Sequence, residues 1–177
     1  MNPKWQLLSV YPLENQDKRV KLLILSINNA SLIIHTLTNY IMKKKAFISG
    51  PIQGMETKQY YRKVVSEICK NCGLEPVDPW EREKILYRGT ESDWWVNVPV
   101  KDFIRRDLED IENCEVLIAY LPKLSAGTCM ELFYAKLKGK KTICICQLES
   151  PSPWIIAHSD VIIKHIKELE NVLKACV

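Results

Sequence analysis

A nearly unbroken apolar run at residues 116–121 (VLIAYL) restricts the fold of this chain more than any other feature. Strands with one face in water alternate apolar and polar side chains, whereas strands of a parallel sheet covered on both faces read as continuous apolar runs. Apolar side chains recur at helical spacing in 100–112, before the run, and a second helical segment follows at 127–137. A buried strand between two helices predicts the centre of an α/β domain.

Short apolar runs and helical segments alternate along the rest of the chain after Met42. The other predicted strands cover 46–49, 74–77, 142–146 and 161–163, and the other predicted helices cover 57–72 and 165–175. Because crossovers between parallel strands are right-handed, this order predicts an α/β fold of the doubly wound, flavodoxin- or Rossmann-like kind, with a parallel five-stranded sheet and helices on both faces. The segment 80–98 shows no clear period and is expected to be an irregular excursion, in which Trp80, Trp94 and Trp95 are available to cover a ligand.

The α/β pattern leaves an N-terminal segment outside it. Residues 20–41 carry short apolar runs interrupted by two asparagines and His35, whereas a membrane-spanning helix needs about 20 mostly apolar residues. No membrane association is therefore expected, and the segment lies too far along the chain for a good signal peptide. We interpret residues 1–41 as an N-terminal extension or a misassigned start, and 42–177 as the folded domain.

Charge and cysteine usage narrow the classes of function. Twenty-five Lys and Arg residues against 21 Asp and Glu give a net charge of +4 without one long basic block, so nucleic acid is not an expected partner. The seven cysteines include a C-x-x-C pair, Cys69 and Cys72, but the three histidines stand at no ligand spacing, which argues against zinc. We interpret the cysteines as buried, reduced thiols of a cytoplasmic protein, and expect neither a metal nor a redox cofactor.

Four segments follow strand ends and reach the carboxyl edge of the predicted sheet, where ligands of doubly wound folds bind. They are 50–54, 78–80, 122–128 and 147–153. After the central strand, 124–131 reads LSAGTCME and opens a helix, so its free backbone N–H groups, the small Gly127 and the hydroxyls of Ser125 and Thr128 suit an anion. Glu131 is a candidate carboxylate nucleophile, although the residues alone favour a first-turn acid on the surface.

Two further patterns carry weaker signals. The helix stretch 105–110 reads RRDLED, and a solvated charged face with pairs such as Arg106–Asp110 accounts for most of it. The stretch 49–54 reads SGPIQG, which is neither a dinucleotide fingerprint nor a Walker A motif. A structural turn explains this stretch as well as a ligand contact does.

Three motifs taken together resemble the nucleoside 2-deoxyribosyltransferase superfamily: GPIQG after the first strand, RDLE before the central strand, and SAGTCMELFYA after it. The resemblance runs from about residue 45 to residue 164, and the branch most similar is that of the 2'-deoxynucleoside 5'-monophosphate N-hydrolases. It implies cleavage of the N-glycosidic bond of (2'-deoxy)nucleoside 5'-monophosphates or nucleosides through a Glu nucleophile, by hydrolysis or base exchange and without a cofactor. Residues 42–177 are then the catalytic domain.

The resemblance also assigns roles to particular residues. Glu131 matches the nucleophile that attacks C1' of the sugar, and Asp107 matches the acid that assists catalysis near the sugar and base. Ser125 and Gly127 match the positions that hold the 5'-phosphate in the hydrolase branch, where the transferase branch usually has Asp in place of Ser125. Ser152 matches a position that reaches a neighbouring subunit's site, which implies a homodimer. The other substrate-binding candidates are Gly50, Ile52, Gln53 and Asp78.

Two residues depart from the hydrolase branch. Gln53 stands where that branch places an Arg on the phosphate, and Phe47 stands where it has a Tyr near the reacting sugar. Tyr60, Tyr61 and Tyr120 are candidates for a replacement hydroxyl.

Three alternatives to the hydrolase remain open at this stage. One is a nucleoside 2-deoxyribosyltransferase proper, and another is a non-catalytic nucleotide-binding sensor on the same fold. The departures at Phe47 and Gln53 favour the sensor, whereas the retained Glu131 and Asp107 oppose it. A third is a partner-binding domain with residues 1–41 as an interaction arm.

Overall fold

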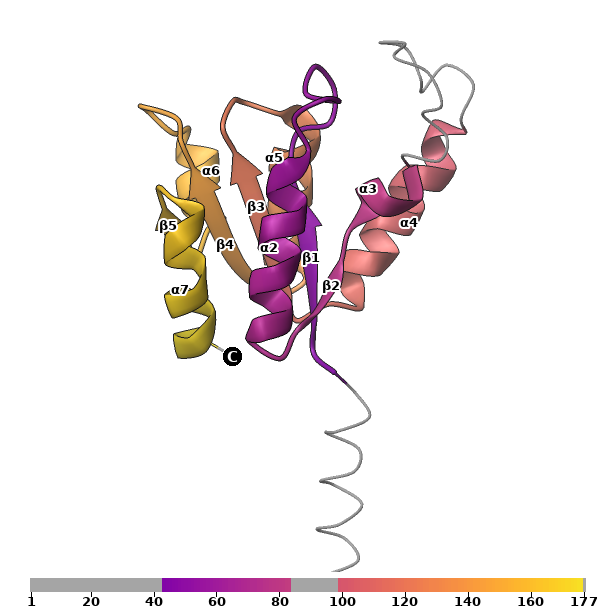
Figure 1. Cartoon of the computed structure of the whole chain (residues 1–177). Helices are drawn as coiled ribbons and strands as arrows, with labels where there is room; N and C mark the ends of the chain where they lie inside the picture. Colours follow the sequence, from indigo (N-terminus) through magenta and orange to yellow (C-terminus); the bar gives the residue numbers. More distant parts are fainter. Residues whose placement is uncertain (1–42, 84–98, 177) are drawn as a thin grey trace, which may run out of the picture. The chain divides into compact units, whose positions relative to one another are not determined.

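Five parallel strands form one sheet in the computed structural model, which describes residues 43–83 and 99–176 (Figure 1). The strands are β1 (Lys45–Ser49), β2 (Glu75–Val77), β3 (Val116–Leu121), β4 (Lys141–Cys146) and β5 (Val161–Ile163), in the order β2-β1-β3-β4-β5. This is the order of flavodoxin-like doubly wound folds, so the predicted fold class is confirmed. The expectations for residues 1–41, Trp94 and Trp95 lie outside the described residues.

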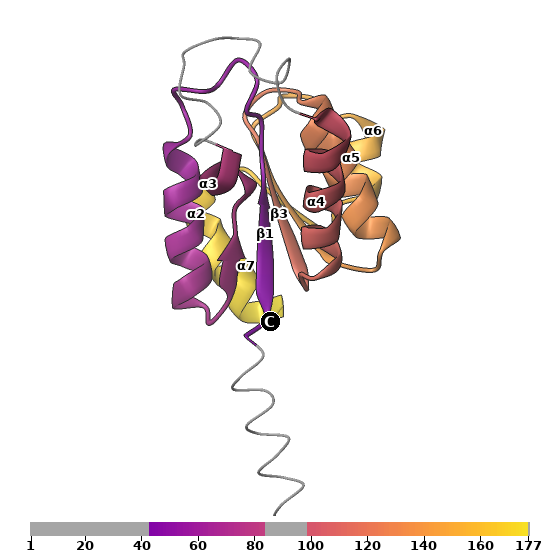
Figure 2. The same ribbon diagram turned by 90° about the vertical axis from the view of Figure 1, so that its right-hand side faces the viewer.

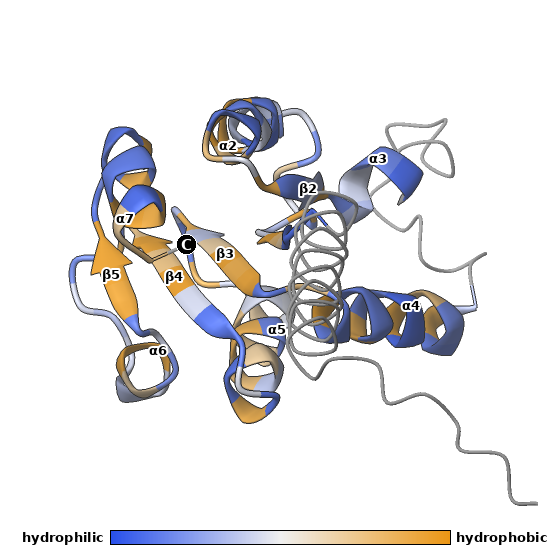
Figure 3. Ribbon diagram, turned by 90° about the horizontal axis from the view of Figure 1, so that it is seen from below, coloured by the Kyte–Doolittle hydropathy of each residue, from blue (hydrophilic) through white to orange (hydrophobic). Residues whose placement is uncertain are grey.

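Helices cover both faces of the sheet (Figure 2). One layer holds α2 (Tyr60–Asn71) and α7 (Leu169–Cys176), and the other holds α4 (Val100–Glu112), α5 (Ala126–Leu137) and α6 (Pro153–Ala157). Successive side chains of β1 enter different layers: Ala46 and Ile48 pack toward α2 and α7, and Phe47 packs toward α4 and α5. Figure 3 shows the resulting apolar character of β3, β4 and β5.

The central strand behaves as its sequence predicts. Every residue of β3 except Tyr120 is buried, and its side chains divide between the two core layers. A strand buried on both faces has no polar side, and this is why its sequence is a continuous apolar run.

Three local features differ from the sequence expectations. The irregular excursion expected from residue 80 instead starts with a short helix, α3 (Pro79–Glu83), where Pro occupies the favoured first position and Asp78 Oδ1 accepts from the Trp80 N–H at 3.1 Å. The helix α6 was not expected; Ser152 caps it by accepting from the Trp154 N–H at 3.3 Å. The closing helix is divided into a 3₁₀ turn (Ile166–Glu168) and α7.

The cysteines are all free thiols, but they are not all buried as expected. Cys69, Cys114, Cys144 and Cys146 are buried, whereas Cys176 near the C-terminus is exposed. Across 43–83 and 99–176, no helix combines the length and the apolar character needed to cross a membrane.

Candidate active site

A cavity of about 320 Å³ lies at the carboxyl edge of the sheet. The turn after β1, the loop after β3 and the helices α4 and α5 supply its walls. Seven of the nine predicted site residues line it: Gly50, Ile52, Gln53, Asp107, Ser125, Gly127 and Glu131. Glu131 and Asp107 therefore line one cavity, while their chemical roles stay predictions.

Glu131 projects from α5 into this cavity and is partly buried. The Ser49 hydroxyl, at the end of β1, donates a short hydrogen bond to Glu131 Oε2. Burial raises the pKa of Glu131 to about 7, and the charge of Asp107 adds to this rise, whereas the Ser49 hydrogen bond and the Arg62 charge oppose it. Glu131 is thus not the exposed first-turn acid that the residues alone favoured.

Asp107 comes from α4 and is 8% exposed. Arg82 of α3 donates to Asp107 Oδ1 at 3.0 Å and also pairs with Asp110 at 2.5 Å. Burial raises the pKa of Asp107 to about 6, against the lowering effect of Arg82. The cavity therefore holds two carboxyl groups that titrate close to neutral pH, which is the range that acid–base catalysis requires.

The part of the cavity wall at the start of α5 suits an anion. Ser125 caps α5, and its Oγ accepts from the Thr128 hydroxyl at 3.1 Å. A Cβ added to Gly127 would meet nothing within 4 Å, so the space beside the first turn of α5 is open. The Lys123 ammonium donates to the carbonyl oxygens of Gln53 and Gly54 at 3.1 and 3.2 Å, and Lys123 lines the same cavity. A helix N-terminus and an ammonium group together attract negative charge.

Comparisons with known proteins identify the kind of protein to which this cavity belongs. Residues 46–172 match the profile of the family described as nucleoside 2-deoxyribosyltransferase. The chain belongs to the nucleoside 2-deoxyribosyltransferase family. A search of curated proteins found no match.

Solved structures of low sequence identity share the fold of this family member. A 2-deoxyribosyltransferase from Bacillus psychrosaccharolyticus has a TM-score of 0.57 at 15% identity, over 72% of this chain and 90% of that one. A conserved protein from Enterococcus faecalis V583 has a TM-score of 0.56, and a 2-desoxiribosyltransferase from Leishmania mexicana has 0.53. Both are 15% identical and cover 76% of this chain and 99% of their own.

Asp78 is the first predicted site residue that does not line the cavity of this family member. Arg62, which is 2% exposed, donates to Asp78 Oδ1 at 2.7 Å and to the carbonyl oxygens of Ile48 and Gly50 at 3.0 and 2.9 Å. Asp78 is thus engaged in joining the end of β2 to the turn after β1. Sequence reasoning missed Arg62, although a basic residue on the same helix face as the buried Val65 signals a buried cation.

Phe47, which stands where the resemblance to the hydrolase branch implies a tyrosine, is a core residue. Phe47 is fully buried and faces the α4–α5 layer. Of the three candidates for a replacement hydroxyl, Tyr60 is 75% exposed and Tyr120 donates to Gln147 Oε1 at 3.4 Å. The buried Tyr61 hydroxyl has no hydrogen-bond partner among the described residues and lies against Gly50, where an added Cβ would stand 2.1 Å from it.

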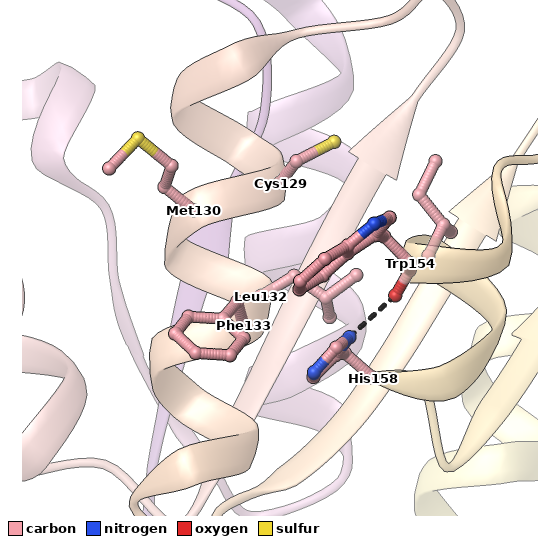
Figure 4. A pocket seen from close by; sticks show the side chains of 7 residues that line it. Cys129, Met130, Leu132, Phe133, Trp154 and His158 are labelled. Atoms are coloured by element: carbon pink, nitrogen blue, oxygen red, sulfur yellow. Dashed lines mark hydrogen bonds between the residues drawn. The ribbon is translucent and has the colours of Figure 1, made fainter.

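Ser152 is the second predicted residue outside the cavity; it caps α6, the helix whose Trp154 and Ile155 line an apolar cleft. The cleft has a volume of about 240 Å³ and lies between α5 and α6 (Figure 4). The Trp154 and His158 rings stack at 5.6 Å between centroids, and Phe133 meets His158 edge-on at 5.0 Å. Met130 and Trp154 are 72% and 69% exposed, so large apolar side chains face outward here.

Proposed function

We propose that this protein cleaves the N-glycosidic bond of (2'-deoxy)nucleoside 5'-monophosphates or nucleosides, with water as the favoured acceptor. The observation that carries the proposal is the pair of carboxyl groups, Glu131 and Asp107, on the wall of one cavity. Such a pair supplies the nucleophile and the acid that glycosidic cleavage needs.

In the first step, Glu131 Oε1 forms a bond to C1' of the sugar while the bond from C1' to the base nitrogen breaks. The base leaves with the electron pair of that bond and takes a proton from Asp107. The transition state resembles an oxocarbenium ion, and the nearby Glu131 carboxylate stabilises its positive charge.

In the second step, a water oxygen forms a bond to C1' and the ester bond from C1' to Glu131 breaks. The electron pair returns to the carboxylate, and the ionised Asp107 accepts a proton from the water. The sum is a free base and a sugar or sugar phosphate, and both acids return to their starting states.

The reaction needs one proton on the pair, and it needs that proton on Asp107. With pKa values of about 6 and about 7, the two groups together hold about one proton between these pH values. In the free protein the higher pKa of Glu131 favours the proton there. Positive charge developing at C1' favours an ionised Glu131, so the form that reacts is the one in which Asp107 already carries the proton.

The anion-attracting side of the cavity supports a 5'-phosphate on the substrate. Ser125 and Gly127 lie there at the start of α5, as in the hydrolase branch that the chain resembles. Gln53 carries no charge, but the ammonium group of Lys123 lies against its backbone carbonyl. We therefore favour monophosphates over free nucleosides.

The decisive experiment is chromatography of a nucleotide and nucleoside panel after incubation with the full chain. Hydrolysis yields a free base and a sugar phosphate from a monophosphate. A new nucleoside formed only after addition of a second base would instead identify a transferase, which family membership also supports. Measurable nucleotide binding without any product would contradict the enzyme assignment and identify a sensor.

We also propose that the active protein is a homodimer in which α6 of one subunit approaches the other subunit's site. The exposed Met130, Phe133 and Trp154 form an apolar surface, and Ser152 stands beside it without reaching its own chain's cavity. Trp154→Arg is expected to convert a dimer into a monomer in light scattering and to lower activity. A wild-type monomer at micromolar concentration with full activity would contradict this proposal.

A further inference from the structure

Ser49 is the last residue of β1 and is 1% exposed. Side chains alternate along a strand, so Ser49 points to the same face as the buried Phe47, toward α4 and α5. Its hydroxyl donates to Glu131 Oε2. Ser49 is not among the residues lining the cavity, so it reaches the reacting atoms only through Glu131.

The other charged or titratable groups that face Glu131 come from two helices. Asp107 approaches from α4, and Arg62 and Tyr61 approach from α2. None of the three hydrogen-bonds to Glu131 within the described part of the chain; Arg62 donates to Gln59, Asp78 and backbone carbonyls, and Asp107 accepts from Arg82. The hydroxyl of Ser49 is therefore the one direct donor to this carboxylate among the residues that the structure describes.

We propose that Ser49 is a positioning residue for glycosidic cleavage, which rests on the assignment of Glu131 as the nucleophile. By donating to Oε2, the hydroxyl favours the ionised carboxylate, fixes its rotation and leaves Oε1 free to bond to C1'. In the glycosyl ester, Oε2 becomes the carbonyl oxygen. The same O–H group continues to donate to it while the bond from Oε1 to C1' breaks and the electron pair returns to the carboxylate.

The hydrogen bond also bears on where the shared proton lies. A donor stabilises the charged form of a carboxyl group, so Ser49 lowers the pKa of Glu131 against the effect of burial. It thereby moves the pair toward the reactive arrangement, in which Glu131 is ionised and Asp107 carries the proton. A serine that merely filled space at the end of β1 would not affect this equilibrium.

A buried hydroxyl elsewhere in the sheet supplies a matched control. Thr142 is fully buried on β4 and, like Ser49, donates to a carboxylate, in this case Asp160 Oδ2 at 3.1 Å. It stands near the opposite end of its strand and does not line the cavity. Thr142→Val therefore removes a buried hydroxyl–carboxylate bond of the same kind without touching the proposed chemistry.

The first test measures Glu131 directly and does not require turnover. Carbon-13 NMR follows the Glu131 carboxyl through a pH titration of the wild type, Ser49→Ala and Thr142→Val, with the signal assigned by its absence in Glu131→Gln. Loss of a hydrogen bond to a charged group raises the pKa of Glu131 by about one unit or more in Ser49→Ala. Thr142→Val leaves it unchanged. An unchanged Glu131 titration in a folded Ser49→Ala variant would overturn the proposal.

The second test is kinetic and uses the substrate found in the panel. Ser49→Ala is expected to lower kcat about 10- to 100-fold with little change in KM. It should also move the alkaline limb of the pH profile, which the higher pKa of the pair sets, to higher pH. Ser49→Cys keeps the volume with a weaker donor, so its kcat should fall between the two, and it replaces Ser49→Ala if the latter fails to fold. Thr142→Val should keep the wild-type kcat.

The two proposals fail in different ways. Wild-type turnover by Glu131→Gln would contradict the proposed function itself. An inactive Glu131→Gln together with wild-type kcat and an unshifted pH profile in Ser49→Ala would leave the proposed function standing and overturn the role of Ser49.

Discussion

Two partly buried acids, Asp78 and Glu131, lie near the carboxyl ends of neighbouring strands and have different hydrogen-bond partners. Asp78, after β2, receives the Arg62 guanidinium at 2.7 Å and a backbone N–H at 3.1 Å. Glu131, beside the end of β1, accepts a hydrogen bond from a single donor among the described residues, the Ser49 hydroxyl. Burial raises the pKa of both, but a full positive charge in direct contact opposes the rise only at Asp78.

This difference separates a structural acid from a reactive one. A buried charge that is paired and hydrogen-bonded stays in one state and holds neighbouring segments together. A buried carboxyl with little compensation changes its protonation near neutral pH and is available for chemistry. The comparison predicts that substitutions at Glu131 and Asp107 affect turnover, whereas substitutions at Arg62 and Asp78 affect folding.

The largest effect is expected from Glu131→Gln. Gln keeps the shape and hydrogen-bonding ability of Glu but does not readily form the ester, so kcat should fall on the order of 10³-fold or more. Nucleotide affinity measured by titration calorimetry should stay nearly unchanged. A folded variant with wild-type turnover would place Glu131 in the same structural class as Asp78.

Asp107→Asn is expected to lower kcat/KM about 10²- to 10⁴-fold, because it removes the proton donor. The wild-type profile should be bell-shaped with its maximum between about pH 6 and pH 7, since one proton on the pair is required. The variant should lose the alkaline limb, and its remaining activity should rise to a plateau as Glu131 ionises near pH 7. An alkaline limb that survives in Asp107→Asn would assign the acid role elsewhere, and the exposed Glu109→Gln on the same helix is the control.

Arg62→Met should lower the free energy of unfolding without a comparable loss of kcat. It leaves Asp78 buried without its partner, which costs about 3–5 kcal/mol in the free energy of unfolding. Arg105→Met removes an exposed helix pair with Glu109 and should cost less than about 1 kcal/mol. Urea denaturation measures the loss of stability in both variants. Equal losses in Arg62→Met and Arg105→Met would contradict the structural role of Asp78 and its distinction from Glu131.

The smallest effect concerns the stability of Glu131→Gln. Glu131 has its ordinary pKa of 4.5 in the unfolded chain and a pKa of about 7 in the folded protein. The folded state therefore binds the proton more tightly than the unfolded state does. As a result, the free energy of unfolding of the wild type falls as pH rises from 4.5 to 7. Above pH 7 the Gln variant should be more stable by ~1–3 kcal/mol, and below about pH 4 the two should agree. Thermal unfolding at both pH values checks this; a constant difference would show that burial does not act on this group.

Most of the fold could be predicted from the sequence because each element depends on its own pattern. The continuous apolar run of β3 and the helical spacing of α4 are local signals of burial. The short helices α3 and α6 were missed because their signals are only a capping side chain and a proline at the first position.

Only those site residues that lie in or next to the recognised motifs could be predicted from the sequence. Seven predicted residues line the cavity, but the roles of Ser49 and Arg62 depend on contacts between distant segments that no local pattern encodes. The rest of α2 and the strand β2 separate Arg62 from Asp78, and nothing in the sequence marks them as partners. Lys123 had a signal, since it lies in the segment that follows the central strand.

The placement of the two catalytic candidates has a consequence for how the site forms during folding. Asp107 and Glu131 stand on helices that immediately precede and follow β3, so one helix–strand–helix unit brings them together. Ser49 comes from a strand 82 positions away from Glu131. Contacts between segments close in sequence form with a smaller loss of chain entropy than distant ones. We therefore expect the two carboxyl groups to meet early on the folding pathway and the nucleophile to acquire its donor only when β1 docks.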